Sequence, residues 1–276
     1  MSLKKLLKSF NNADSPLLVS PRFEQYLATH PNILVDEKVA DFIRSELVTP
    51  QRDRRMTFSA SSRGACPREQ VFQFTSVKPV PRTNSSLYAI FHQGTFMHLK
   101  WQALLLDAGI LSDPEVKCEW AEYNMTGTID GVGEVPGSLA DKYSDEFFGW
   151  ELKSINDRGY SWVINNGPNQ NHLLQIHAYM AASGIDLWSL CYENKNNQEW
   201  VEFVIRKDDE IVERVREELG SLNGYVERKE LPPILDECSK KQGKYKSCPF
   251  AADCLEQTAW PEIKEEVAKI SRRIRL

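Results

Sequence analysis

The sequence has no apolar run long enough to span a lipid bilayer, which argues against an integral membrane protein. Three lysines lie near its start, Lys4, Lys5 and Lys8, but the apolar stretch beside them is too short and too broken for the hydrophobic region of a secretory signal. We therefore expect a cytoplasmic protein with no membrane partner.

Positive charge is not in excess either, because 34 lysines and arginines face 39 acidic residues and the net charge is -5. Proteins that coat nucleic acid through their overall charge are usually basic, so this balance argues against that class. Two short segments, 51–68 and 240–246, are nevertheless basic. They supply the candidate phosphate contacts, which are Arg63, Arg68, Lys240, Lys241 and Lys244.

Cysteine is scarce, with six residues in 276. A cytoplasmic location favours thiols or metal ligands over disulfides. Two of the six, Cys118 and Cys191, lie in strand-like patterns and are expected in the core. The others lie on either side of the central part of the chain, and these are Cys66, Cys238, Cys248 and Cys254. Four thiolates suit an iron–sulfur cluster or a zinc ion, and a shared centre would tie the N-terminal region to the C-terminal one.

The chain has no internal repeat, and its 41% of hydrophobic residues are enough for one large core. Helical spacing of apolar residues predicts helices over 36–47, 91–108, 171–182 and 208–226. Alternating or apolar runs predict strands over 116–123, 125–132, 147–155, 187–192 and 200–205, the last two as a hairpin. This order predicts an α/β fold with a mixed sheet flanked by helices.

An acidic constellation lies in the middle of the chain. Asp130 belongs to a Gly-Thr-Ile-Asp-Gly segment, and the strand period of two places Glu151 and Lys153 of Glu-Leu-Lys on one face. Mg²⁺ takes a few carboxylates while keeping waters, and a nearby lysine offsets charge on a phosphate. An isolated Glu-x-Lys is more often a solvated pair. Here Trp150 and Leu152 indicate a central strand, where a charged pair suggests a function.

Two further features complete the pattern. His98 lies inside the predicted helix 91–108, in Gly-Thr-Phe-Met-His, and Gln175 and Tyr179 are four residues apart, so they share one face of a later helix. In this order, with Asp130 and Glu151-x-Lys153 between them, the residues resemble the RecB-like branch of the PD-(D/E)XK nuclease superfamily.

The resemblance implies a restriction-endonuclease-like core and a Mg²⁺- or Mn²⁺-dependent deoxyribonuclease. The implied metal ligands are His98, Asp130, Glu151 and the carbonyl of Leu152. Lys153 would be catalytic, and Gln175 and Tyr179 would contact substrate or support the lysine.

The cysteines resemble the iron–sulfur subgroup of the same superfamily, which includes the AddB nuclease domain and CRISPR-associated RecB-like exonucleases. There one cysteine precedes the core and three follow it, usually as Cys-x2-Cys-x5-Cys. The Cys-Pro-Arg start at Cys66 and the x5 spacing before Cys254 match, whereas nine residues separate Cys238 from Cys248. The resemblance favours a [4Fe–4S] cluster over Zn²⁺, as a joint between the two ends of the fold.

The resemblance covers about residues 61–256 and leaves 1–60 as an N-terminal helical cap and 257–276 as a basic C-terminal tail. It implies an exonuclease acting on free-ended, preferentially single-stranded DNA in a bacterial or phage-infected cell. The implied setting is phage recombination or replication, DNA degradation or CRISPR adaptation, with partner proteins from those pathways. A structure-specific or restriction-like endonuclease and a catalytically inactive DNA-binding assembly protein are the alternatives.

Overall fold

The computed structural model describes residues 15–32, 34–48, 56–77 and 85–261. The N-terminal lysines, the first three arginines of the basic segment 51–68 and residues 262–276 of the predicted tail lie outside the described residues. In the part that is described, no helix is long and apolar enough to cross a membrane.

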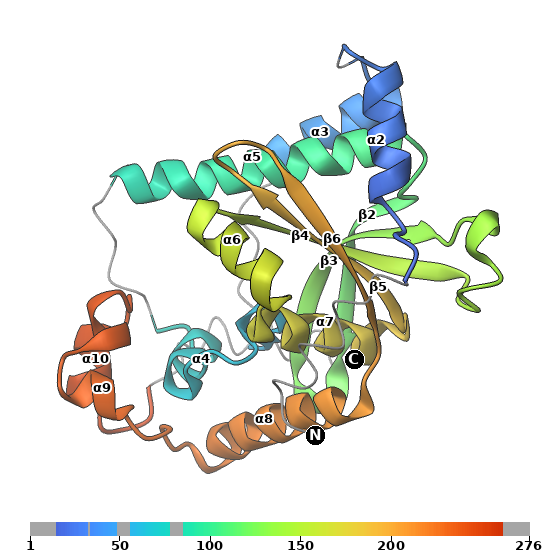
Figure 1. Ribbon diagram of the computed structural model, residues 1–276. Helices are drawn as coiled ribbons and strands as arrows, with labels where there is room; N and C mark the ends of the chain where they lie inside the picture. The colour runs from blue at the N-terminus through green and yellow to red at the C-terminus, as the bar shows by residue number, and fades with distance from the viewer. Residues whose placement is uncertain (1–14, 33, 49–55, 78–84, 262–276) are drawn as a thin grey trace.

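A six-stranded mixed sheet forms the centre of the molecule (Figure 1). Parallel pairs join β1 to β3 and β4 to β5, while the β2–β3, β3–β4 and β5–β6 pairs are antiparallel. The strands are β1 (Phe58–Ser59), β2 (Asp113–Trp120), β3 (Met125–Glu134), β4 (Phe147–Ile155), β5 (Leu187–Asn194) and β6 (Trp200–Arg206). The predicted mixed sheet is confirmed.

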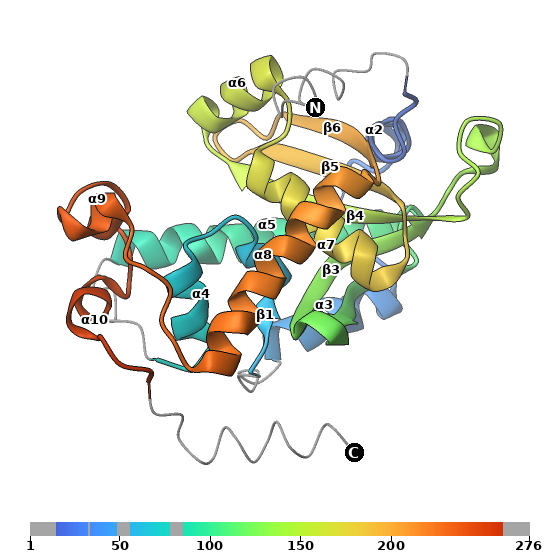
Figure 2. The ribbon, with the colours of Figure 1, turned by 90° about the horizontal axis from the view of Figure 1, so that it is seen from below.

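Helices cover both faces of this sheet, as predicted, with α5 on one side and α7 and α8 on the other (Figure 1). Two more helices, α9 and α10, lie side by side next to α4 at one end of the molecule (Figures 1 and 2). The helices are α2 (Ser20–Thr29), α3 (Glu37–Val48), α4 (Pro67–Phe74), α5 (Ser85–Asp107), α6 (Asp157–Asn166), α7 (Gln170–Ser183), α8 (Asp209–Arg228), α9 (Asp236–Ser239) and α10 (Ala251–Glu256).

Each face of the sheet has its own apolar core. On the α5 side, Trp101 packs with Trp150 and Leu152 of β4. On the α7 side, Ile176 and Leu190 belong to a larger cluster that also includes residues of α8. β4 is therefore buried on both faces, and its charged residues Glu151 and Lys153 belong to a central strand, as its apolar neighbours indicated.

A buried carboxylate fixes the N-terminal helix to the far edge of the sheet. Glu202 of β6 accepts hydrogen bonds from the backbone N–H groups of Leu18, Val19 and Ser20, at 2.7–3.2 Å, and from the Ser189 hydroxyl at 2.8 Å. The negative charge lies at the start of α2, where helix N–H groups lack partners. This part of the predicted N-terminal cap therefore shares the core of the sheet.

The predicted elements are found, with most ends within three residues of the prediction, and the strand predicted over 147–155 has the bounds of β4. The helix predicted over 91–108 begins earlier, because α5 starts at Ser85. Gly109 has a φ of 63° just after α5, a left-handed conformation that glycine adopts readily and that ends the helix. Among the described elements, five helices and one strand, α2, α4, α6, α9, α10 and β1, were not predicted individually. All six are short, so they contain too few turns or alternations for a clear period.

Candidate active site

An opening in the sheet lies beside β3. β3 pairs with β2 along one edge, and on its other edge it pairs first with β1, at Met125 and Thr126, and then with β4, from Gly131 to Glu134. Within the described ladders, residues 127–130 have no strand beside them on that second edge. Since β3 and β4 diverge there, they leave a cavity of about 690 Å³.

Side chains hydrogen-bond to the backbone around this opening. The Tyr179 hydroxyl donates to the carbonyl of Thr128 at 2.8 Å, and the Asp130 carboxylate accepts from the N–H of Leu152 at 2.9 Å. A Cβ on Gly127 would lie 2.5 Å from the Tyr179 ring, so only glycine lets this ring approach the strand. Side chains thus take the place of ladder partners for backbone groups around the opening.

Glu151, Lys153, Gln175 and Tyr179 form one hydrogen-bonded group in the cavity. The Lys153 ammonium donates to Glu151 Oε1 at 2.6 Å and to Gln175 Oε1 at 2.8 Å. The Gln175 amide then donates to Glu151 Oε1 at 2.8 Å and to the Tyr179 hydroxyl at 3.1 Å. Gln175 therefore contacts the candidate catalytic carboxylate and lysine directly, and Tyr179 contacts Gln175.

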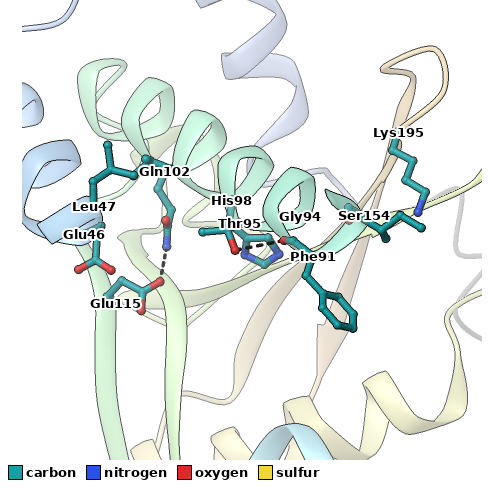
Figure 3. Close-up of a pocket in the computed structure, with 12 residues that line it drawn as sticks. Glu46, Leu47, Phe91, Gly94, Thr95, His98, Gln102, Glu115, Ser154 and Lys195 are labelled. Atoms are coloured by element: carbon teal, nitrogen blue, oxygen red, sulfur yellow. Dashed lines mark hydrogen bonds between the residues drawn. The ribbon is translucent and has the colours of Figure 1, made fainter. Parts of the chain in front are cut away.

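His98 approaches the same site from α5. Its Nδ1 lies 3.2 Å from Asp130 Oδ2, and one turn later Gln102 donates hydrogen bonds to the Asp130 carbonyl and to Glu115, both at 2.8 Å. Figure 3 shows His98 and Gln102 in the lining of a second cavity, of about 510 Å³, along α5. His98 therefore lies between the two cavities.

The carboxylates differ in protonation because their surroundings differ. Burial and the charge of Asp130 raise the pKa of Glu151 to about 7. Burial also acts to raise the pKa of Asp130, but His98, Lys153 and the N–H of Leu152 outweigh it and the pKa falls below its usual range. Burial acts to lower the pKa of His98, but Asp130 and Glu151 raise it overall. Asp130 is therefore the more readily ionised of the two carboxylates.

The donor set fits a hard divalent cation. Asp130 and Glu151 present carboxylates to one cavity, and Glu151 Oε2 is buried with no hydrogen-bond partner among the described residues. A cation would supply that missing partner. Within the described chain, no group of three or more His, Cys, Asp or Glu side chains already has the arrangement of a metal site. Ligation by His98 and by the Leu152 carbonyl stays a prediction.

Several residues of this cavity were not recognised in the sequence. They are hydroxyl-bearing, basic or thiol side chains on β1, η1 (Ala60–Ser62), β2 and β3, namely Ser59, Ser61, Lys117, Cys118, Thr126 and Thr128. Cys118 was expected in the core but is only half-buried, and burial together with the charge of Glu151 raises its pKa to about 11. The two-residue strand β1 has no periodic signal, so only the tertiary structure identifies Ser59.

The four flanking cysteines line one small cavity between α4, α9 and α10. Burial raises the pKa of Cys238, and the nearby Cys66 and Cys248 raise it further. Burial also raises the pKa of Cys254, and the other three thiols act in the same direction. The nine residues between Cys238 and Cys248 fold into the end of α9 and the 3-10 turn η4 (Gly243–Lys246), which returns the chain to the cavity. What these thiols bind stays a prediction.

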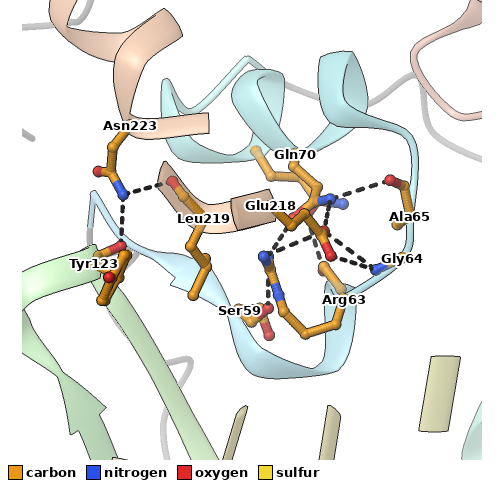
Figure 4. A network of polar contacts seen from close by, with 11 residues as sticks. Ser59, Arg63, Gly64, Ala65, Gln70, Tyr123, Glu218, Leu219 and Asn223 are labelled. Carbon is orange, nitrogen blue, oxygen red and sulfur yellow. Dashed lines mark hydrogen bonds and ion pairs between the residues drawn. The ribbon is translucent and has the colours of Figure 1, made fainter. Parts of the chain in front are cut away.

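A polar network connects the two sites (Figure 4). Glu218 of α8 accepts hydrogen bonds from the Gly64 N–H at 3.1 Å and from the Gln70 amide at 3.0 Å, and it pairs with Arg63 at 3.3 Å. The segment held in this way runs from Ser59, in the cavity with Asp130, to Cys66, in the cysteine cavity.

The expected roles of two arginines need correction. Arg63 is 1% exposed and contacts Gln70, Glu218 and the Ser59 carbonyl, while Arg68 is 5% exposed and donates to the carbonyls of Pro232 and Gln257. Guanidinium groups buried in this way do not face a phosphate from solvent. Their charge instead holds the segments that carry the cysteines.

The lysines of the second basic segment differ from these arginines. Lys240 and Lys241 are exposed, and Lys244 is half-buried and pairs with Glu69 at 2.7 Å. The first two therefore stay candidates for phosphate contact. Among the aromatic residues near the basic segments, Phe58, Phe72 and Phe74 are buried in apolar clusters and are not available to stack on bases.

No protein-family model and no curated protein matches this chain. Among solved structures, SSO0001 aligns at 17% identity and a TM-score of 0.44 over 78% of this chain and 92% of its own. LHK-Exo in complex with dAMP aligns at 15% identity and a TM-score of 0.47, and the alkaline exonuclease LHK-Exo from Laribacter hongkongensis at 14% and 0.44, each over 64% of this chain and 90% of its own. These likenesses are distant, so the function proposed below depends on the residues of this chain.

Proposed function

We propose that this protein is a metal-dependent deoxyribonuclease that hydrolyses phosphodiester bonds, as an exonuclease acting on free-ended DNA. The observation that supports this most strongly is the meeting of Asp130, Glu151 and Lys153 in one cavity, at the opening between β3 and β4. Two carboxylates and an ammonium group at one point suit an anionic substrate that is bound together with a divalent cation.

In this proposal Asp130 and Glu151 hold Mg²⁺ or Mn²⁺, and His98 and the Leu152 carbonyl complete the ligand set. The ion, when bound, offsets charge on the phosphate and lowers the pKa of the attacking water. Lys153 orients that water and offsets the negative charge that develops on the phosphate. Gln175 holds the Lys153 ammonium in place, and Tyr179 holds Gln175.

The cysteine cavity has a structural role in the same proposal. We assign a [4Fe–4S] cluster to Cys66, Cys238, Cys248 and Cys254, with Zn²⁺ as the alternative. Four thiols that share one cavity are the donor set that either centre requires. The cluster would fix the segment from Ser59 to Cys66 and so the wall of the active site. Exposed Lys240 and Lys241 would guide DNA past this end, in recombination, replication, DNA degradation or CRISPR adaptation.

The test is a time course with end-labelled linear single- and double-stranded DNA and with covalently closed single-stranded circles, with Mg²⁺ or Mn²⁺ added. We expect progressive loss of nucleotides from linear DNA and intact circles, and we expect Asp130→Asn to abolish the reaction. Asp107→Asn is the matched control, because Asp107 also makes a close hydrogen bond, to Tyr26 at 2.6 Å, but on the outer part of α5. Cleavage of circles would show an endonuclease, and no cleavage with either metal would contradict the proposal.

A further inference from the structure

A separate cavity lies beyond the end of the candidate catalytic strand. It has a volume of about 610 Å³, within the range of small-molecule sites, and is walled by α6, the start of α7 and the ends of β4 and β5. Its described lining offers aromatic, aliphatic, amide and hydroxyl groups together with the guanidinium of Arg158 and the imidazole of His172. We call it the α6 cavity.

The α6 cavity shares a wall with the active site. Lys153 of β4 lies in register with Tyr192 of β5, and the Tyr192 hydroxyl contacts His172 Nδ1 at 2.8 Å and the Asn169 N–H at 3.0 Å. Ile155, in the cavity lining, follows Lys153 by two residues, a distance of about 7 Å along a strand. One extended nucleotide can cover that distance from the site of Lys153.

The amides of this cavity are held in fixed orientations. Asn165 and Asn166 each donate through Nδ2 to a backbone carbonyl of α6, at 2.7 and 2.8 Å, so their oxygens are left to accept other bonds. Asn156 and Asn169 each accept through Oδ1 from a backbone N–H, both at 2.9 Å, so their Nδ2 groups are left to donate. The backbone partners fix these assignments, and the lining therefore offers both donors and acceptors to a planar ring edge.

A large exposed aromatic ring adds a stacking surface. Trp162 is 46% exposed and lies one helical turn after Arg158, on the stretch of α6 that lines the cavity. None of the described residues that line the cavity is acidic. Burial and the charge of Lys153 lower the pKa of His172 to about 3, so this ring is neutral at physiological pH. An exposed indole, fixed amides and a single guanidinium are the groups that recognise unpaired bases.

We propose that the α6 cavity binds an unpaired nucleobase of the strand whose phosphate lies at Lys153, with Trp162 stacking on the base. The proposal rests on the nuclease function for the direction of the strand, but the cavity itself is tested by binding alone. It gives a physical basis for a preference for single-stranded DNA, because a paired base cannot enter this cavity.

The test measures fluorescence anisotropy of labelled oligomers of about twelve nucleotides, within the usual size of single-strand sites, with no divalent metal added. One oligomer is oligothymidylate and the other is an abasic strand of equal length and charge. We expect the wild-type protein to bind thymidylate more tightly, and Trp162→Ala to weaken that binding about five- to one-hundredfold, the range for one lost base–aromatic stack. Binding of the abasic strand stays unchanged.

Two variants serve as controls. Trp162→Phe keeps a stacking ring and is expected to keep most of the preference for bases. Phe147→Ala removes a comparably exposed ring, 42% against 46%, at the opposite end of β4 and should leave both affinities unchanged. Thermal unfolding of each variant checks that the fold is kept.

Equal binding of the two oligomers by the wild-type protein would overturn the inference, as would equal weakening of both by Trp162→Ala. These outcomes can be told apart from failure of the proposed function. Base-dependent binding without metal-dependent cleavage would support base binding in the α6 cavity and refute the nuclease function. Metal-dependent cleavage without base-dependent binding would support the nuclease function and refute base binding in the α6 cavity.

Discussion

Replacing Lys153 with methionine separates catalysis from stability, because the chain offers a matched control. Lys153 pairs with the buried Glu151 at 2.6 Å. Lys100 of α5 pairs at 2.7 Å with the buried Glu193 of the neighbouring strand β5, which is in register with Ser154. Both substitutions remove one ammonium group beside one buried glutamate and keep the aliphatic side chain. Only Lys153 contacts Gln175 and faces the candidate active site.

The expected size of each effect follows from the surroundings. Loss of one preorganised group that stabilises developing charge lowers the rate roughly 10²- to 10³-fold, and we expect this for Lys153→Met. Its stability should fall by only about 1–3 kcal/mol, because Glu151, with a pKa of about 7, takes up a proton when its partner is lost. Lys100 is 40% exposed, so solvent screens its pair and Lys100→Met should lose less than about 1 kcal/mol.

The assay is Mn²⁺-dependent release of nucleotides from linear DNA, at a temperature where urea titration shows both variants fully folded. Lys100→Met should cleave at the wild-type rate. Wild-type cleavage by folded Lys153→Met would refute the role of the lysine. An equal loss of cleavage in both variants would instead show that the effect is on the fold.

Three further predictions concern stability and the thiol site. Glu202→Gln should lower the free energy of unfolding, measured by urea titration, by about 2–4 kcal/mol. The reason is that an amide NH₂ would face backbone N–H groups that now donate hydrogen bonds to the carboxylate. A loss below about 0.5 kcal/mol would contradict this prediction. The pKa of His172 is about 3 in the folded protein and 6.5 in the unfolded chain, so the stability present above pH 6.5 is lost as the pH falls toward 3. The wild-type protein should therefore lose about 2 kcal/mol of unfolding free energy through this residue between pH 7.5 and 5, and His172→Gln should not show that part of the loss. The same pH profile of stability in both proteins would contradict this prediction. Cys66→Ser should lower stability and remove visible absorbance of the purified protein, whereas Cys118→Ser should keep the colour; a colourless, zinc-loaded wild type would exclude the cluster.

The elements that could be predicted from the sequence are those with a strong local pattern. The bounds of β4 follow from its apolar run, and its burial on both faces explains why Glu151 and Lys153 are unusual there. The opening beside β3 has no local signal, because it depends on how the two-residue strand β1 and the strand β4 share one edge. Motif order predicted which residues belong together, while the pairing of strands decides how they meet.

The basic segments show the opposite case. Charge alone predicted that Arg63 and Arg68 face solvent, yet both are buried. Contacts with distant residues keep them buried. Arg63 pairs with Glu218, which is 155 residues away in the sequence, and Arg68 donates to the carbonyl of Pro232, which is 164 residues away. No window of sequence contains both partners, so composition could not distinguish these arginines from the exposed Lys240 and Lys241.

The bond between Glu202 and the start of α2 also bears on the order in which the chain is completed during synthesis. The three backbone N–H groups that this carboxylate accepts precede it by 182–184 residues. When α2 leaves the ribosome, its partner strand β6 has not been made, so α2 cannot dock until β6 follows. The cysteine cavity closes later still, since Cys66 must wait for Cys254. α2 and the cysteine cavity therefore reach their final packing only after the distant segments β6 and α10 have been synthesised.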